Sequence, residues 1–304
     1  MTATDATNGF VGYLGRSESD SPPADGVVCI EAGPDWKLRF KSAGIPCYTW
    51  RDGFVLLSGN GFLNSRGSRK KLTAESIALE YLELGERVVT SLEGAYSVAL
   101  WDAKRQKLLL WRDDAGAGLL YFYQTTDNSI WFASTLQLLL RYTGTHPISK
   151  LGLAEYLRFL DISPPYTIYE NVVFLPSDQF VKVNPAMPVE CQEKLPEPDS
   201  FNGNFSKFDD GVIAFDELLK NNIANTVESV PNVCSFLSGG IDSSLVTAVA
   251  ATLSEDVHAV TVGFENTRFD ESPVARRITE YLGIKHEVMQ FTLEEDLDAF
   301  ESFT

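Results

Sequence analysis

The sequence Ser-Gly-Gly-Ile-Asp-Ser-Ser, which begins at Ser238, combines groups that could bind an anion. Gly239 and Gly240 can take up positive φ and let the backbone approach a ligand closely. The hydroxyl groups of Ser238 and Ser243 can donate hydrogen bonds to phosphate oxygens. Asp242 would repel a phosphate on its own, so its presence indicates a magnesium ion held between its carboxylate and the phosphates.

Two other phosphate-binding motifs do not fit this loop. A Walker A loop needs a lysine after its last glycine, but Ile241 follows Gly240, and the dinucleotide fingerprint G-x-G-x-x-G is absent. The remaining alternative is an ordinary strand, turn and helix in which Asp242 or Ser243 caps the helix. The elements around the loop decide between these interpretations.

Strands and helices alternate around the loop. Apolar runs at residues 233–237, 257–264 and 285–291 predict strands, and residues 243–253 and 272–282 predict helices between them. This order predicts a parallel sheet covered by helices on both faces. Ligands of such sheets bind beyond the carboxyl ends of the strands, where the next helix also points its amides. The context therefore favours an anion site.

The first 183 residues predict a different kind of domain. β-Branched and aromatic runs predict strands, including two hairpins with turns at residues 103–107 and 125–129. Helical patterns at residues 74–85 and 151–160 interrupt the strands. This mixture indicates a layered α+β domain.

A boundary between the two domains is predicted at residues 184–206, which are rich in proline and polar residues. Prolines remove amide donors and glycines loosen the chain, so this segment is predicted to be a linker. The predicted domains are therefore residues 1–183 and residues 207–304.

Composition and charge argue against several classes of protein. The 304 residues carry 25 Lys and Arg against 42 Asp and Glu, a formal net charge of −17. Binding to nucleic acid or to an anionic membrane through bulk charge is therefore not expected. No apolar run is long enough for a membrane span, and the N-terminus lacks the features of a secretory signal. These features predict a cytoplasmic protein.

The cysteines and histidines form no recognisable motif. The four cysteines are scattered without metal-ligand spacing, which predicts reduced thiols: Cys29, Cys47, Cys191 and Cys234. The three histidines lie far apart in the sequence, which predicts structural roles: His146, His258 and His286.

Several segments resemble one family in the order in which that family has them. Residues 238–244 resemble the pyrophosphate-binding PP-loop of N-type ATP pyrophosphatases, and residues 269–289 resemble the segment after the second strand in the asparagine-synthetase family. Residues 92–102 and 108–123 are similar to the end of that family's N-terminal glutamine-amidotransferase domain, which is of the Ntn type. Residues 166–183 resemble the stretch that leads into the synthetase domain.

The resemblance implies an Ntn-like α+β domain followed by the start of an α/β PP-loop ATP pyrophosphatase domain. It also implies ATP and Mg²⁺ as cofactors, and amide-bond formation through an acyl-adenylate with release of AMP and pyrophosphate. It assigns pyrophosphate binding to five residues, with Asp242 also on magnesium: Ser238, Gly239, Gly240, Asp242 and Ser243. It places Leu237 and Val262 against adenine.

The amidotransferase half departs from the family. The family uses an N-terminal cysteine as nucleophile, but residue 2 is Thr2 and the nearest cysteine is Cys29. Asn60 and Gly61 match the family's oxyanion loop, whereas Phe62 replaces its acid. We therefore expect this half to keep the fold and to have lost the glutaminase chemistry.

This pattern resembles β-lactam synthetases and lasso-peptide cyclases, as does Arg-Asp-Asp-Ala-Gly at residues 112–116. The resemblance implies that an amine within the substrate attacks the adenylate. Two alternatives stay open: an asparagine synthetase that uses glutamine or ammonia, and a non-catalytic relative that binds a nucleotide or a peptide.

The family's catalytic lysine, second metal-binding acid and carboxylate pocket are all expected downstream of Thr304. The resemblance therefore predicts an incomplete synthetase half in this chain. The expected partners are a small-molecule or peptide carboxylate substrate and either the missing C-terminal half of the synthetase domain or a second copy of the chain.

Overall fold

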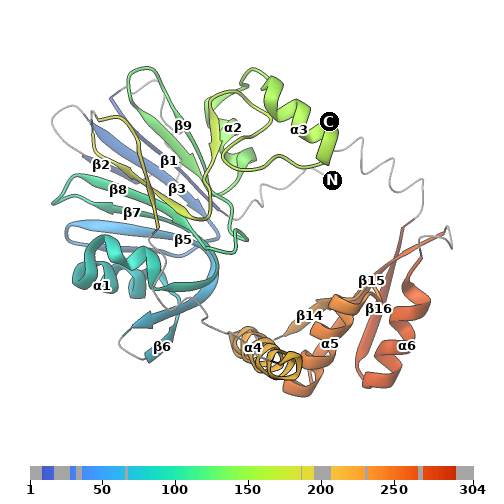
Figure 1. Cartoon of the computed structure of the whole chain (residues 1–304). Coiled ribbons are helices and arrows are strands. Elements are labelled where there is room, and N and C mark those ends of the chain that lie inside the picture. The colour runs from blue at the N-terminus through green and yellow to red at the C-terminus, as the bar shows by residue number, and fades with distance from the viewer. Residues whose placement is uncertain are drawn as a thin grey trace. The chain divides into compact units, whose positions relative to one another are not determined.

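The computed structural model consists of two compact units, residues 1–200 (unit 1) and residues 201–304 (unit 2) (Figure 1). The structure describes residues 9–16, 28–31, 36–65, 68–185, 187–194, 207–229, 232–265 and 270–291. Within these ranges, no helix is long and apolar enough to cross a membrane. No group of three or more His, Cys, Asp or Glu side chains in the same ranges could hold a metal ion.

One antiparallel sheet of unit 1 has six strands in the order β11-β9-β10-β1-β3-β2. The strands are β1 (Gly9–Gly15), β2 (Val28–Glu31), β3 (Lys37–Ala43), β9 (Tyr121–Gln124), β10 (Ile130–Ala133) and β11 (Val172–Phe174). Strands β9 and β10 form the hairpin predicted to turn at residues 125–129, with Gln124 opposite Ile130.

The other sheet has seven strands, in the order β13-β12-β8-β7-β5-β4 with β6 paired to β5. The strands are β4 (Cys47–Trp50), β5 (Gly53–Ser65), β6 (Ser68–Lys71), β7 (Leu92–Asp102), β8 (Lys107–Arg112), β12 (Gln179–Val183) and β13 (Glu190–Glu193). The predicted hairpin between β7 and β8 is confirmed, with Asp102 opposite Lys107.

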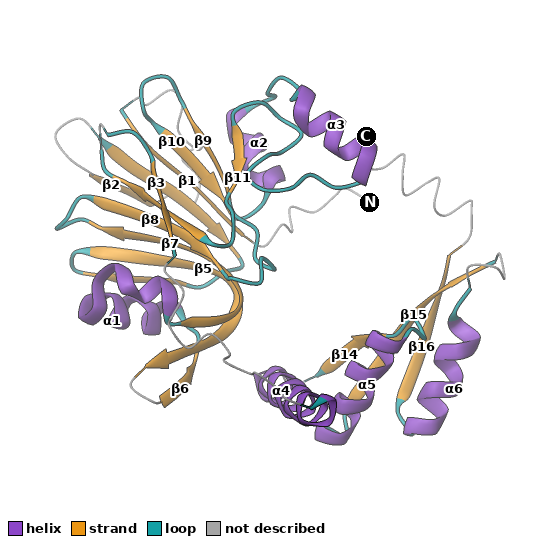
Figure 2. Ribbon diagram, viewed as in Figure 1, coloured by secondary structure: helices purple, strands orange, loops and turns teal. Residues whose placement is uncertain are grey.

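Unit 1 is built in layers, with the two sheets in the middle and helices outside (Figure 2). Large apolar side chains from both sheets, such as Phe10, Phe54 and Trp101, fill the space between them. Helix α1 (Ala74–Leu84), followed by a 3₁₀ turn at Gly85–Thr90, packs on the seven-stranded sheet, and α2 (Leu136–Thr143) packs on the six-stranded sheet. Helix α3 (Lys150–Phe159) follows α2. The layered α+β fold predicted from the sequence is confirmed.

Residues 190–193 form strand β13 inside the stretch for which the sequence predicts a linker. The strand pairs with β12, and the buried Lys194 follows it. The Lys194 ammonium donates hydrogen bonds to the carbonyl oxygen of Arg112 and to Asp114 Oδ1, the latter at 2.7 Å. These contacts join residues about 80 positions apart in the chain, so local composition does not reveal them.

Unit 2 contains a three-stranded parallel sheet in the order β14-β15-β16. The chain runs through α4 (Phe208–Ser229), β14 (Val233–Phe236), α5 (Ile241–Leu253), β15 (Val257–Phe264), α6 (Ser272–Leu282) and β16 (Lys285–Phe291). The alternation of strands and helices predicted from the sequence is confirmed.

Helices cover one face of this sheet among the described residues, not both as the sequence predicts. Each crossover steps to the next strand in the same direction, so the right-handed rule places α5 and α6 on the same side. On that side Leu237, Ala259 and Ala275 are buried together. We call the opposite side the open face; its side chains include Phe236, which is 75% exposed, and Met289, which is 49% exposed.

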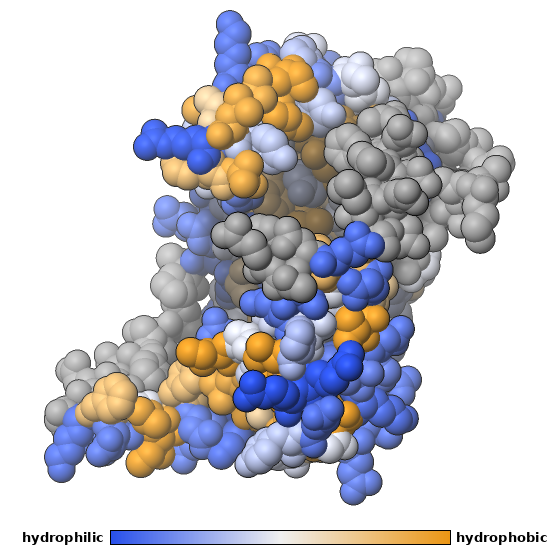
Figure 3. Space-filling view, turned by 90° about the vertical axis from the view of Figure 1, so that its right-hand side faces the viewer, coloured by the Kyte–Doolittle hydropathy of each residue, from blue (hydrophilic) through white to orange (hydrophobic). Residues whose placement is uncertain are grey.

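Both units expose apolar side chains to solvent, as the orange areas of Figure 3 illustrate. In unit 1 most apolar side chains of α3 lie at the surface; Leu157 is 73% exposed and Phe159 is 65% exposed. On α1, Ile77 and Tyr81 are buried, whereas Leu82 is exposed. The helical period is therefore right, but it does not tell which apolar residues the sheets bury.

Candidate functional site

The loop at residues 238–240 connects the carboxyl end of β14 to the first turn of α5. Gly239 has a φ of +83°, a conformation that residues with a Cβ atom rarely adopt. A Cβ atom at this position would lie 3.0 Å from the Cβ and Cγ1 atoms of Val274 on α6. The loop therefore needs glycine at position 239 for both its backbone conformation and its packing.

Serine hydroxyl groups hold the loop in shape. Ser238 Oγ lies 3.0 Å from Ser243 Oγ, and the Ser238 amide donates a 3.3 Å hydrogen bond to the same Ser243 hydroxyl. The Ser244 hydroxyl donates a 2.6 Å hydrogen bond to the carbonyl oxygen of Gly240. Because these bonds connect both ends of the loop, its shape exists without a ligand.

The first amides of α5 are open to a ligand. Gly240 is the N-cap residue and no side chain caps the helix, which removes the alternative in which Asp242 or Ser243 acts as the cap. Within the part of the chain that the structure describes, no group accepts a hydrogen bond from the amides of Ile241, Asp242 or Ser243. Three amides without an acceptor at the positive end of a helix can bind an anion.

The five residues predicted to bind pyrophosphate lie together in this loop and first turn. The Asp242 side chain is exposed on the first turn of α5, next to the open amides. An exposed carboxylate beside an anion cradle fits Mg²⁺, which proteins usually hold through one or two carboxylates together with the phosphates of a substrate.

The two residues predicted to contact adenine point in different directions. Leu237 follows β14, but its side chain is 1% exposed and packs with Ala259 and Ala275 under the helices. Val262 lies inside β15, and its side chain is half-buried on the open face. The Leu237 side chain is therefore not accessible to a ligand. Its backbone groups already have partners, because the amide donates to the carbonyl oxygen of Val260 and the carbonyl oxygen accepts from Thr261.

The remnants predicted for glutamine hydrolysis do not form a loop in the structure. Asn60 and Gly61 lie inside β5, paired in register with β7. Thr2 lies outside the described residues, as does the side chain of Cys29 in β2. Cys47 is a free, exposed cysteine on the edge strand β4, and desolvation of its sulfur raises the pKa of the thiol. A raised pKa disfavours the reactive thiolate.

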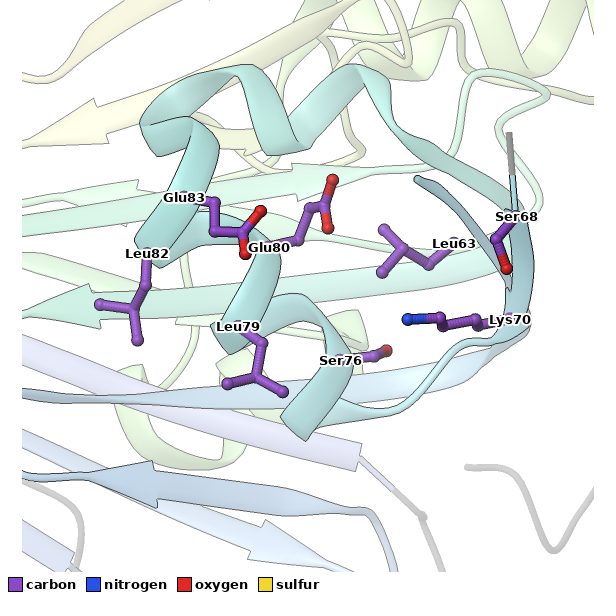
Figure 4. A pocket seen from close by; sticks show the side chains of 8 residues that line it. All are labelled: Leu63, Ser68, Lys70, Ser76, Leu79, Glu80, Leu82 and Glu83. Carbon is purple, nitrogen blue, oxygen red and sulfur yellow. The ribbon is translucent and has the colours of Figure 1, made fainter. Parts of the chain in front are cut away.

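A cavity of about 620 Å³ lies in unit 1 between α1 and the β5–β6 hairpin (Figure 4). Its walls combine acids, a lysine, two hydroxyls and apolar groups: Leu63, Ser68, Lys70, Ser76, Leu79, Glu80, Leu82 and Glu83. The Glu80 carboxylate points into it, although this residue is only 8% exposed. The two serines that line the cavity, Ser68 and Ser76, are internal residues, so neither has the free α-amine that an Ntn-type nucleophile uses as its base.

The sequence reasoning did not foresee the role of a second glycine-bearing loop, residues 113–118 of unit 1. The buried Asp113 carboxylate accepts hydrogen bonds from the amides of Tyr96, Ala117 and Gly118, at 3.3, 3.0 and 2.6 Å. The Arg112 guanidinium donates 3.1 and 2.8 Å hydrogen bonds to the carbonyl oxygens of Gly116 and Gly118. These bonds satisfy the amides of Ala117 and Gly118 and the carbonyl oxygens of Gly116 and Gly118.

Two family profiles match the chain, one in each unit. A profile described as asparagine synthase matches residues 214–304, and one described as glutamine amidotransferase domain matches residues 65–192. The first match includes the loop and α5, and the second includes most of the strands of the seven-stranded sheet. The two matches follow each other in the order predicted from the sequence.

Similar curated proteins carry the name asparagine synthetase (glutamine-hydrolyzing). Protein 2 of that name from Lotus japonicus is 26% identical over 272 residues, which are 82% of this chain and 41% of the relative. Protein 1 from Bacillus subtilis (strain 168) is 28% identical over 217 residues, 70% of this chain and 33% of the relative. The chain therefore spans well under half the length of these relatives.

Among solved structures, glutamine phosphoribosylpyrophosphate amidotransferase from B. subtilis, complexed with ADP and GMP, is similar to this chain. The sequences are 13% identical, the TM-score is 0.38, and the match covers 92% of this chain and 65% of that one.

Proposed function

We infer that the chain belongs to the asparagine-synthetase family, and on this premise we propose that it contributes the ATP-binding loop to an enzyme that forms amide bonds. A carboxylate oxygen of the substrate attacks the α-phosphorus of ATP, and the bond between the α- and β-phosphates breaks, so that pyrophosphate leaves. An amine then attacks the acyl carbon, releases AMP and loses a proton. The observation that carries the proposal is the set of three open amides at the start of α5.

Each residue of the loop has a role in this reaction. The amides of Ile241, Asp242 and Ser243 bind pyrophosphate oxygens and stabilise the charge that develops as the leaving group departs. The Ser238 hydroxyl, at the outer rim of the loop, donates a further hydrogen bond. Gly239 keeps the backbone close enough for these contacts.

Asp242 is the residue that would hold magnesium. A bound Mg²⁺ ion neutralises phosphate charge and thereby makes pyrophosphate a better leaving group. The carboxylate is exposed beside the cradle, so it can reach an ion on the phosphates without leaving the loop.

The amine comes from within the substrate in our proposal, as in β-lactam synthetases and lasso-peptide cyclases. Two features of unit 1 support this: a half-buried Phe62 in place of the family's acid, and a cavity whose only hydroxyls among the described residues belong to the internal Ser68 and Ser76. A glutamine-dependent asparagine synthetase is the second candidate, because the amidotransferase profile matches unit 1 and the similar curated proteins bear that name.

The open face of unit 2 is where we place the remainder of the synthetase domain, on a longer chain or on a separate one. Apolar side chains line this face, including Phe236, Phe264 and Met289, which are 75%, 42% and 49% exposed. Parallel sheets are covered on both faces. The substrate carboxylate would bind between this face and its cover. Three free cysteines, Cys47, Cys191 and Cys234, support the cytoplasm as the compartment.

The products formed from ATP test the proposal. The protein, together with any chain that completes the synthetase domain, should convert ATP into equal amounts of AMP and pyrophosphate, which ³¹P NMR distinguishes from ADP and phosphate. Asp242→Asn should slow pyrophosphate release by about a hundredfold, the size of losing one charge-stabilising contact. Production of ADP and phosphate instead would contradict the acyl-adenylate route.

Glutamate release tests the source of the amine. We expect no glutamate above background when the protein is incubated with glutamine, with or without ATP. Release of glutamate that disappears in a Thr2, Cys29 or Cys47 variant would move the protein to the glutamine-dependent branch.

A further inference from the structure

Three hydrogen-bonded groups form a line across the sheet of unit 2, directly behind the 238–243 loop. Thr261 of β15 is 2% exposed, and its hydroxyl oxygen lies 2.6 Å from the carbonyl oxygen of Leu237. The same hydroxyl oxygen lies 2.8 Å from His286 Nε2 on β16. The line therefore joins β16 to the last residue before Ser238.

The positions of the protons along this line follow from the two distances. The Leu237 carbonyl oxygen can only accept, so the single proton of the Thr261 hydroxyl points at it. His286 Nε2 must then donate to the Thr261 oxygen, which fixes the neutral imidazole as the Nε2–H tautomer. Protonation of the ring adds a proton at Nδ1 and leaves the donor at Nε2 in place.

The Leu237–Ser238 peptide is held at both of its polar ends. Its carbonyl oxygen accepts from Thr261, and its Ser238 amide donates to the Ser243 hydroxyl at 3.3 Å. A peptide unit is planar, so fixing the two ends fixes the orientation of the whole unit. This orientation determines where Gly239 starts and therefore where the open amides of α5 lie relative to the loop.

We propose that Thr261 and His286 are positioning residues for the anion site, acting through the Leu237 carbonyl. The inference rests on the proposed function and assigns it two residues that touch neither ATP nor magnesium. Loss of the Thr261 hydroxyl leaves the Leu237 carbonyl without its side-chain donor and lets the peptide rotate. His286 acts one step further away, by holding the Thr261 hydroxyl in the donating orientation.

The charged groups near His286 do not interrupt its hydrogen bond to the Thr261 hydroxyl. Burial lowers the pKa of His286, and the positive charges of Arg276 on α6 and His258 on β15 lower it further. On the open face, Glu287 of β16 lies 3.6 Å from His258, Oε2 to Nε2. None of these groups lies between Nε2 and the Thr261 hydroxyl, which are in direct contact.

Variants of two buried threonines test the proposal. Thr261→Val should weaken the binding of magnesium pyrophosphate about tenfold, the size of one hydrogen bond to a buried carbonyl, as measured by isothermal titration calorimetry. Thr261→Ser keeps the hydroxyl and should restore the affinity. Thr279→Val is the matched control, because Thr279 is also 2% exposed and bonds only within its own helix, to the carbonyl oxygen of Arg276. Equal losses in the two valine variants would overturn the proposal.

A double variant tests whether Thr261 and His286 affect pyrophosphate binding through the same carbonyl or independently of each other. His286→Phe should weaken binding, and adding it to Thr261→Val should cause no further loss, because both act through the same carbonyl. Additive losses would show that His286 acts by another route.

Amide NMR spectra without any ligand separate this proposal from the proposed function. Thr261→Val, but not Thr279→Val, should shift the resonances of Gly239 to Ser243. If the unaltered chain binds no pyrophosphate but the loop shifts in this way, the proposed function fails and the positioning role stands. Unshifted loop resonances in Thr261→Val would contradict the positioning role and leave the proposed function unaffected.

Discussion

Two loops of this molecule contain similar residue types but differ in whether their amides have hydrogen-bond acceptors. Residues 113–118 follow the buried strand β8, and residues 238–243 follow the partly exposed strand β14 and Leu237. Both segments carry two glycines and at least one aspartate. In the first loop the buried carboxylate of Asp113 accepts three amide hydrogen bonds. In the second loop the carboxylate of Asp242 is exposed, and the amides beside it find no acceptor among the described residues.

The difference teaches how to distinguish a structural loop from a binding loop. A buried polar group without a partner costs stability, so a loop with a purely structural role satisfies its own amides. A loop that keeps amides open at a helix N-terminus can offer them to an anion. The composition of a loop therefore says less about its function than the partners of its amides.

Removal of the Asp113 carboxylate should have the largest effect. Asp113→Ala leaves three amides without their acceptor, and we expect the free energy of unfolding of unit 1 to fall by about 3–5 kcal/mol. Urea unfolding followed by tryptophan fluorescence measures this, because all five tryptophans lie in unit 1: Trp36, Trp50, Trp101, Trp111 and Trp131.

The control for that variant is Asp161→Ala, which changes an exposed aspartate in the same unit. We expect it to alter stability by less than about 0.5 kcal/mol. If Asp113→Ala were as harmless as the control, the contrast between the two loops would disappear, since water would then satisfy the amides equally well.

Gly239→Ala should damage the binding loop rather than the fold. The φ of +83° and the 3.0 Å contact with Val274 oppose any Cβ atom, and strain of about 1–2 kcal/mol corresponds to roughly tenfold weaker pyrophosphate binding. Gly283→Ala is the matched control, because Gly283 has a φ of +68° at the end of α6 with open space around it. Gly283→Ala should lower the stability of unit 2 and leave the affinity for pyrophosphate unchanged. Equal losses of affinity in Gly239→Ala and Gly283→Ala would mean that backbone strain anywhere in unit 2 weakens binding.

The stabilities of the two units should depend on pH in different ranges. The pKa of His286 is lowered by burial and by Arg276 and His258, so the unfolded chain binds its proton more readily than the folded chain. The stability that this residue provides is fully present above the ordinary value of 6.5 and decreases as the pH falls below it. In unit 1, burial alone would raise the pKa of Asp102, but hydrogen bonds from Arg105 and Tyr81 outweigh burial and lower it. That contribution is lost only below the ordinary value of 3.8.

Thermal unfolding at different pH values tests this difference. Between pH 7 and pH 5, about the range in which histidine titrates, far-UV circular dichroism should report a falling melting temperature for helix-rich unit 2. Burial also lowers the pKa of His146 in unit 1, so the comparison is made in a His146→Gln background, in which the tryptophan fluorescence of unit 1 should change little. His286→Gln should flatten the decline of unit 2. Asp102→Asn should flatten a separate decline of unit 1 that begins only below the ordinary carboxylate value of 3.8. A unit 2 transition that does not move in this range would contradict the assignment.

The sequence predicts local features well and long-range partners poorly. The strand–loop–helix at residues 233–253 was predictable because apolar runs, two glycines and a helical pattern are all local. Strand β13 was not, because its pairing with β12 is assisted by Lys194, whose partners lie about 80 residues away. The open face was also not predictable, since the direction of both crossovers depends on the order of the strands.

For the binding site, the residue types were predictable but their orientations were not. Ser238, Gly239 and Asp242 could be singled out from their residue types together with the strand and helix predicted on either side. That Leu237 turns its side chain into the core depends on packing against Ala259 and Ala275. The role of Thr261 likewise depends on strand register, which brings it beside His286 and Leu237.

The most direct test of the account is an NMR titration of the ¹⁵N-labelled chain with pyrophosphate, with and without Mg²⁺. We predict saturable shifts at the amides of Ile241, Asp242 and Ser243, stronger with the metal present, and no shifts at Ala117 and Gly118, whose amides are already satisfied. Resonances of the α5 amides that stay in place, or shifts of equal size in both loops, would contradict the claim that open amides make this loop the anion site.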